Sequence, residues 1–320
     1  MGGIAGIRIL VVGYNAFDVI VPAGKFPAPD EKAEVARVIT CGGGPGATAA
    51  VALARLGAEV KLITPLTDDV PGRLQRDELL AAGVDLTGSP TIAGRDSPKA
   101  VILVDEGRGT RTIFWSRGDV PQLESGYGAP GLLDHIDLLY TDGHEAEVSL
   151  RLARLARERD LPVVMDAGSV RTGSAELVAC CTDVVSSRGF APALTGHAAP
   201  LDALRALRDM GPERVAMTFG SEGVLGLEND RPLLVASFTV PVKDTTGAGD
   251  AFHAGYAFAL AKGLEFGSCL EWGSAVAGLK CRDWGGRLGL PDLQEVQSLL
   301  ANGKRNSLDG LGARVADSRI

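Results

Sequence analysis

The stretch Asp244-Thr245-Thr246-Gly247-Ala248-Gly249-Asp250-Ala251-Phe252 decides how the rest of the chain is interpreted. A run typical of a β-strand, residues 233–242, precedes it, and its periodicity predicts an amphipathic helix over about 251–261. Glycines at such a turn leave backbone N–H groups uncovered at a helix N-terminus, where the helix dipole also favours negative charge. The stretch therefore predicts an anion-binding turn.

A carboxylate, Asp250, stands at the mouth of this turn. A negative charge is unexpected in an anion site unless it takes a proton from a nucleophile that attacks a phosphate held there. A second interpretation is a helix cap, because Asp is common at helix N-termini and Gly-Ala-Gly also suits a simple tight turn. Spacing alone does not separate the two interpretations.

Length and composition indicate one large α/β domain with a small accessory element, since the chain has 320 residues and is 45% hydrophobic. A net charge of −8 argues against nucleic-acid or anionic-membrane partners, although one helix terminus can still hold a phosphate. The five cysteines form no CxxC pair, and there is neither a basic leader nor an apolar run long enough to span a membrane. We therefore expect a cytoplasmic protein without a disulfide framework.

Alternating strand and helix patterns fill most of the chain. Ile7–Gly13 is a nearly continuous apolar run that predicts a buried parallel strand. Asp18 follows it at the carboxyl end, where it is placed to accept hydrogen bonds from substrate hydroxyls, or to stabilise a turn. Further strands are expected at 60–64, 138–141, 161–166, 183–186 and 214–218, and helices at 145–160, 200–210 and 271–281. This order predicts a mainly parallel sheet with helices on both faces.

Two segments, 19–41 and 97–116, interrupt the alternation. Strand patterns over 33–39, 100–104 and 110–114, with a hairpin turn at 106–109, predict a small antiparallel sheet; prolines at 22, 27 and 29 mark a loop. Such a sheet would act as a lid that keeps water from the reaction. We expect a single domain over 1–302, followed by a polar, aperiodic and flexible tail over 303–320.

Glycine clusters mark further binding segments. Residues 42–57 join glycines to a helix of small residues, but they match neither the Rossmann fingerprint nor the P-loop, which argues against a dehydrogenase. Thr218, Gly220 and Gly223 lie at a strand end upstream of the anion turn, where they suit a nucleotide or a plain hairpin turn. A loop over 282–291 is expected to lend carbonyl oxygens to a monovalent cation near Asp244.

The segments Gly43-Gly44-Pro45-Gly46-Ala47-Thr48 and Asp244–Phe252 together resemble the ribokinase/PfkB family of carbohydrate kinases. The resemblance covers Ile7 to about Pro291 and implies a ribokinase-like three-layer α/β sandwich with a mainly parallel central sheet and a small β-sheet lid. It implies ATP-dependent phosphorylation of a sugar hydroxyl, with ATP, Mg²⁺ and K⁺ as cofactors. It also implies a homodimer formed through the lid.

Carried over residue by residue, the resemblance makes Asp250 the catalytic base and the amides of Gly247, Ala248 and Gly249 the anion hole. Three further groups follow. The substrate group is Asp18, Gly43, Gly44 and Thr48. The nucleotide group is Thr218, Gly220 and Gly223. The potassium group is Asp244, Thr246 and Gly286.

The chain departs from the family pattern at several positions. Thr48 stands where many ribokinases carry Asn, on the sugar side. Ser187 and Phe190 occupy the positions of the family's Asn-x-x-Glu motif, which is linked to magnesium and phosphate. We therefore expect Mg²⁺ to be held mainly by the nucleotide and water, or by residues that the sequence does not identify.

The pattern is most similar to the sulfofructose and fructose kinase branch, through the 42–52 segment, His253 and the 279–287 segment. Lys32 falls where that branch has a lysine reaching the anionic group of its substrate, and His144 where it has an arginine for the sulfonate. One imidazole suits a sulfonate less well than a guanidinium fork, so an uncharged ketose such as fructose is favoured. His144 as a plain loop histidine, a sulfofructose kinase, a nucleoside kinase of the same fold and a regulator without catalysis remain alternatives.

Overall fold

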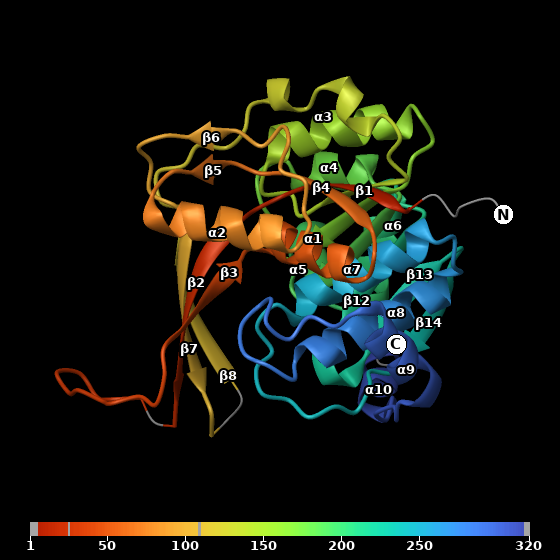
Figure 1. The fold of residues 1–320 in the computed structure, drawn as a ribbon. Coiled ribbons are helices and arrows are strands. Elements are labelled where there is room, and N and C mark those ends of the chain that lie inside the picture. Colours follow the sequence, from red (N-terminus) through yellow and green to blue (C-terminus); the bar gives the residue numbers. More distant parts are fainter. Residues whose placement is uncertain (1–5, 25, 108–109, 317–320) are drawn as a thin grey trace.

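A computed structural model describes residues 6–24, 26–107 and 110–316 of the chain. Its body has a large central sheet covered by helices on both faces, and a smaller sheet extends from one side of this body (Figure 1). The three-layer α/β sandwich with a separate small sheet is thus confirmed.

The central sheet has eight strands in the order β14-β13-β12-β11-β10-β9-β1-β4. Neighbouring strands within the series β12, β11, β10, β9, β1 and β4 pair in parallel. Strand β13 pairs antiparallel with both β12 and β14. Their bounds are β1 Arg8–Val12, β4 Glu59–Ile63, β9 Leu138–Thr141, β10 Val163–Ala167, β11 Asp183–Ser187, β12 Arg214–Thr218, β13 Val224–Glu228 and β14 Arg231–Val235. Parallel strands bring their carboxyl ends to one edge, where ligands bind in such sheets.

Side-chain alternation along the strands builds the layers. Ile9 and Val11 of β1 point into one apolar cluster, and Leu10 and Val12 point into the other. The first cluster is covered by α1 Pro45–Arg55, α7 Ala248–Ala261, α8 Phe266–Lys280 and α9 Leu293–Asn302. The second is covered by α3 Ala146–Arg157, α4 Ser174–Cys180, α5 Phe190–Thr195, α6 Pro200–Asp209 and α10 Asp309–Ala316.

The lid is a four-stranded sheet in the order β3-β2-β7-β8, with bounds β2 Ala16–Ala23, β3 Ile39–Gly43, β7 Lys99–Asp105 and β8 Thr110–Ser116. Helix α2 Val70–Ala81 contacts β2 and β3, and the two-stranded sheet β5 Leu66–Thr67 with β6 Thr91–Ile92 lies next to it. Short 3₁₀ turns occur at Ser125–Tyr127, Pro130–Leu133 and Gly220–Glu222.

Three details of the predicted lid are wrong. The sheet is mixed, because β2 and β7 pair in parallel. Residues 31–38 form no strand, and the strand expected there begins at Ile39. Pro22 lies inside β2 and not in a loop. Strand β3 pairs with β2 only as far as Ile20, so β2 has no neighbouring strand on the β3 side at Pro22. The missing N–H of Pro22 therefore breaks no hydrogen bond to β3.

The prediction of a flexible tail from residue 303 is also wrong for its described part. Arg305 pairs with Phe238 in an isolated bridge, and α10 follows. Leu311 and Val315 of α10 are buried in the second apolar cluster, which explains why the segment is fixed. Residues 317–320 of the predicted tail lie outside the described residues.

The connection into the anion turn differs from expectation as well. Strand β14 ends at Val235 rather than near 242, and an irregular segment leads from it to α7, which begins at Ala248. The turn is therefore held by neighbouring loops and not by a preceding strand. No helix of the described part of the chain has the length and apolar character needed to cross a membrane.

Candidate active site

Gly247 forms the turn at the N-terminus of α7 with φ of 74°, in the left-handed region. A Cβ atom on it would lie 2.7 Å from the Cα atom of Gly286, closer than any real contact. Only glycine therefore allows this turn to press against the 285–286 loop. At Gly249 a Cβ atom would meet nothing within 4 Å, so the space beside this residue is open.

The three amides of the predicted anion hole are not equivalent. The Ala248 N–H donates to the Thr245 carbonyl oxygen at 3.2 Å. The N–H groups of Gly247 and Gly249 have no acceptor among the described residues. At a helix N-terminus such unused donors are ready for an anion.

Asp250 occupies the first turn of α7, partly exposed, among other acids. Burial and the negative charge of Asp166 raise the pKa of Asp250 to about 7, and His253 opposes this rise. The His253 Nδ1 atom lies 3.3 Å from Asp166 Oδ2 and 2.6 Å from the Gly249 carbonyl oxygen, while Nε2 lies 3.0 Å from the Val185 carbonyl oxygen. Burial lowers the pKa of His253, but these carbonyl acceptors and the Asp250 charge favour its protonated form.

This acidic environment predicts how activity depends on pH. We expect kcat/KM of the wild type to fall as pH drops through about 7, because Asp250 accepts a proton only when it is ionised. Asp166 and Asp18 also have pKa values raised to about 7, so the apparent value belongs to the group. A pH profile with saturating magnesium and ATP checks this; a flat profile across neutral pH would contradict it.

Within the predicted potassium group, the oxygens of Asp244 accept hydrogen bonds from protein donors. The Asp244 carboxylate accepts hydrogen bonds from Thr246 N at 2.9 Å, Thr246 Oγ1 at 2.8 Å and Gly285 N at 2.8 Å. Its main-chain oxygen accepts from Lys280 Nζ at 3.0 Å, and Lys280 is fully buried.

A potassium ion exchanges its water for several oxygen ligands. An ion bound to the Asp244 carbonyl would lie beside the Lys280 ammonium, and two like charges 4 Å apart repel by about 4 kcal/mol at an effective dielectric of 20. Asp244, Thr246 and Gly286 do lie together, but a potassium ion on the Asp244 carbonyl oxygen does not fit beside Lys280.

The substrate group gathers at the base of the lid, around β2 and the start of α1. Asp18 on β2 is 6% exposed and packs so close to Gly43 that a Cβ there would lie 2.1 Å from Asp18 Oδ2. Gly44 caps α1 and the buried Thr48 lies within it, with an Oγ1 atom that has no partner in the described chain. Burial raises the pKa of Asp18 to about 7, while Arg287 lowers it.

Arg287 was not among the predicted site residues. Its Nη2 atom donates to Asn15 Oδ1 at 3.0 Å and to the Gly43 carbonyl oxygen at 2.6 Å, and Nη1 lies 3.4 Å from Glu78 Oε1. It thereby ties the loop after α8 to the lid base. The only sequence signal was its place beside the glycines of the 285–286 loop.

His144 is buried and stacks on Tyr14 with ring centroids 4.4 Å apart. Its Nε2 atom lies 2.6 Å from Nη2 of Arg171, which comes from the loop after β10. Sequence reasoning missed Arg171, because it lies 27 residues from His144. The absence of an arginine at position 144 is therefore a weaker argument against an anionic sugar, because the guanidinium of Arg171 lies beside His144.

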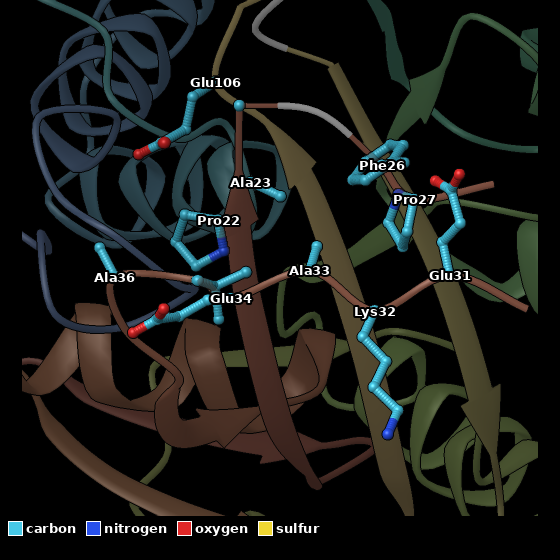
Figure 2. Close-up of a pocket in the computed structure, with 12 residues that line it drawn as sticks. Pro22, Ala23, Phe26, Pro27, Glu31, Lys32, Ala33, Glu34, Ala36 and Glu106 are labelled. Atoms are coloured by element: carbon cyan, nitrogen blue, oxygen red, sulfur yellow. The ribbon is translucent and has the colours of Figure 1, made fainter.

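Lys32 is not brought to the other predicted residues. It is exposed on the 26–38 loop, which lies at the end of the lid remote from the body (Figure 1). There it lines a cavity of about 390 Å³ together with Pro22, Phe26 and Glu106 (Figure 2). That cavity shares no other residue with the predicted site.

The nucleotide group lines a cavity of about 570 Å³ next to the anion turn. Its walls include Thr218, Gly220 and Gly223 on one side, and Ala248 and Gly249 of α7 on the other. Apolar walls are supplied by Phe238, Val240, Val242 and Phe252. A concave, largely apolar space that opens onto unused amides suits a base, a sugar and a phosphate chain.

Arg111 reaches this cavity from lid strand β8 and was not among the predicted site residues. Its Nη1 atom donates to Thr245 Oγ1 at 2.6 Å, and its positive charge acts on Asp250. A guanidinium at this place can contact a transferred phosphoryl group.

No group of three His, Cys, Asp or Glu side chains in the described ranges could hold a metal ion. The substituted Asn-x-x-Glu positions are used structurally. Ser187 Oγ donates to the Gly168 carbonyl and accepts from the Phe190 N–H, and the Phe190 side chain is buried in the core. Neither side chain is available to magnesium.

Comparison with known proteins places these features in a family. The family model described as "pfkB family carbohydrate kinase" matches residues 7–293. Ribokinase of Bacillus subtilis is 28% identical over 297 residues, which is 92% of this chain and 99% of that protein. Ketohexokinase of Mus musculus is 27% identical over 296 residues, which is 86% of this chain and 96% of that protein. The structure of Arabidopsis thaliana ribokinase complexed with ribose and ATP has a TM-score of 0.80 at 22% identity, covering 93% and 100%; this last likeness concerns the fold alone.

Proposed function

The chain belongs to the pfkB family of carbohydrate kinases, an ATP-dependent kinase of sugars or nucleosides, and from this premise we propose that it phosphorylates a hydroxyl of a ketose-type sugar such as fructose. One observation carries the proposal. Asp250 follows the unused amides of Gly247 and Gly249 in sequence, Gly249 lines the nucleotide cavity, and the charge of Asp250 acts on Asp18. A base, an anion site and a hydroxyl ligand thus belong to one neighbourhood, which supports this reaction.

Each residue then has a defined task. Asp18 accepts hydrogen bonds from sugar hydroxyls, and Asp250 takes the proton of the reacting hydroxyl. As the sugar oxygen bonds to the γ-phosphorus, the bond from this phosphorus to the bridging oxygen breaks and ADP leaves. The Gly247 and Gly249 N–H groups stabilise charge on the transferred group. Magnesium, when bound with the nucleotide phosphates, neutralises part of their charge, and no described side chain is assigned to hold it.

Arg111 is expected to contribute to phosphoryl transfer. We predict that Arg111→Ala lowers kcat by roughly 10- to 100-fold, since one preorganised donor is typically worth about that much or more. Its thermal midpoint should change little, because the side chain is exposed. Arg111→Lys keeps the charge but not the fork and should recover only part of the rate. Steady-state kinetics in ATP check this, and wild-type kcat in Arg111→Ala would remove Arg111 from the proposal.

The identity of the sugar is the finer part of the proposal. Because Arg171 lies beside His144, anionic sugars must be tested with neutral ones. ADP release should be measured with fructose, ribose, sulfofructose, 2-keto-3-deoxygluconate and nucleosides. The proposal expects the highest kcat/KM with a ketose; a clear preference for a nucleoside would replace it with a nucleoside kinase.

The expected potassium ion is left out of the proposal, and the expected homodimer is kept. Potassium is not part of the proposed site, because Lys280 already lies on the Asp244 carbonyl. A homodimer through the lid remains proposed, supported by apolar side chains that the lid exposes. These are Val101, Ile113, Phe114 and Trp115.

A further inference from the structure

Lys280 is a fully buried lysine at the last residue of α8. Its ammonium donates to the main-chain oxygen of Asp244 at 3.0 Å and to that of Asp283 at 3.4 Å. Burying an ammonium is costly unless it is compensated, so such a lysine calls for an explanation. It lies on carbonyl oxygens of the anion turn and of the loop packed against it, where the family resemblance implied potassium.

The surroundings of Lys280 are those of a bound cation. Burial lowers the pKa of Lys280, but the negative charges of Asp244 and Asp250 oppose this shift. The carbonyl end of α8, whose last residue is Lys280, also favours a positive charge there. Asp244 in turn fixes the turn, since its carboxylate holds Thr246 on one side and Gly285 on the other. A positive charge at this place therefore orders the turn and supports negative charge on a group bound at the amides.

We propose that the Lys280 ammonium is a built-in replacement for an activating monovalent cation, so that this kinase works without potassium. The inference rests on the proposed function, because it assumes phosphoryl transfer at this turn. Lys280 acts as a positioning residue: it touches the turn and not the reacting atoms.

The test compares turnover in potassium with turnover in choline at equal ionic strength. Wild-type turnover should change by less than about twofold, because the site already carries its cation. Lys280→Ser removes the ammonium and leaves room and a hydroxyl oxygen for an ion; it should lose at least about tenfold in choline and recover most of this in potassium. Lys280→Met fills the space without a charge and should stay slow in both salts.

A second readout does not depend on turnover. The thermal midpoint of Lys280→Ser, without sugar or ATP, should rise with potassium relative to choline, whereas that of the wild type should not. Lys243→Ala is the matched control, because Lys243 precedes Asp244 in the chain but its ammonium, among the described residues, contacts the exposed side chain of Asp283 and not a carbonyl oxygen of the turn. This variant should behave as the wild type does in both readouts.

Three results would overturn the proposal: strong activation of the wild type by potassium, a folded Lys280→Ser that potassium changes in neither readout, or a Lys243→Ala variant that responds like Lys280→Ser. If no sugar or nucleoside is phosphorylated, the proposed function fails, yet the thermal measurements still decide what occupies the cation position.

Discussion

Asp250→Asn is expected to fold normally and to lose turnover by a factor of roughly 10² to 10⁴, the usual contribution of a general base. The amide is nearly the same size as the carboxylate but cannot take the hydroxyl proton. Because burial and Asp166 disfavour the ionised form, removing this charge should leave the thermal midpoint unchanged or raise it. The helix-cap interpretation predicts the opposite, a loss of about 1 kcal/mol with normal turnover.

The matched control is Asp202→Asn. Asp202 stands at the third residue of α6, as Asp250 does in α7, but it lies outside the site and pairs with Arg205. Turnover should be unchanged in this variant. Wild-type turnover in Asp250→Asn, or an equal loss in both variants, would contradict the role of Asp250.

Gly247→Ala should be the other severe substitution. Its side chain would meet the backbone of Gly286 at 2.7 Å in a left-handed turn, so the turn must move. Because displacements of about 1 Å can cost on the order of 10²-fold, we expect a loss of that size in kcat. Kinetics and thermal unfolding of the same preparation check it.

Gly263→Ala provides the control for backbone strain. Gly263 follows the other end of α7 with the same φ of 74°, but a Cβ there would meet nothing within 4 Å. Both variants should lose about 1 kcal/mol of stability from the left-handed conformation, and only Gly247→Ala should lose turnover. Similar turnover in the two would show that the packing of the turn on Gly286 is unimportant.

The body of the fold followed from local patterns because its strands are short, apolar and regularly separated by helices. The ends of β9 and β12 agree with the predicted ones, and the two glycine segments indicated the family. Prediction failed where long-range pairing overrides local pattern. Pro22 is tolerated in β2 because β3 no longer pairs with β2 at that position, and α10 is held in place by burial of Leu311.

The part of the candidate site that lies in short continuous motifs could be predicted from the sequence. Asp250 and its glycines form one continuous stretch, whereas Arg111, Arg171 and Lys280 reach the site from elements distant in the sequence. Long side chains allow such contacts from many positions, so no spacing rule identifies them. Potassium at the expected group was not tested, and the motif could not show that a lysine contacts the Asp244 carbonyl oxygen.

Phosphoryl transfer to a sugar hydroxyl, with Asp250 as the base, can be tested on the product itself. The most direct measurement incubates wild type and Asp250→Asn with ATP, magnesium and each sugar, then determines the mass of the sugar product beside released ADP. We predict one sugar that gains a single phosphoryl group in step with ADP, and almost no product with the variant. Binding of ATP and sugar without any phosphorylated product, or equal product from both proteins, would contradict the account.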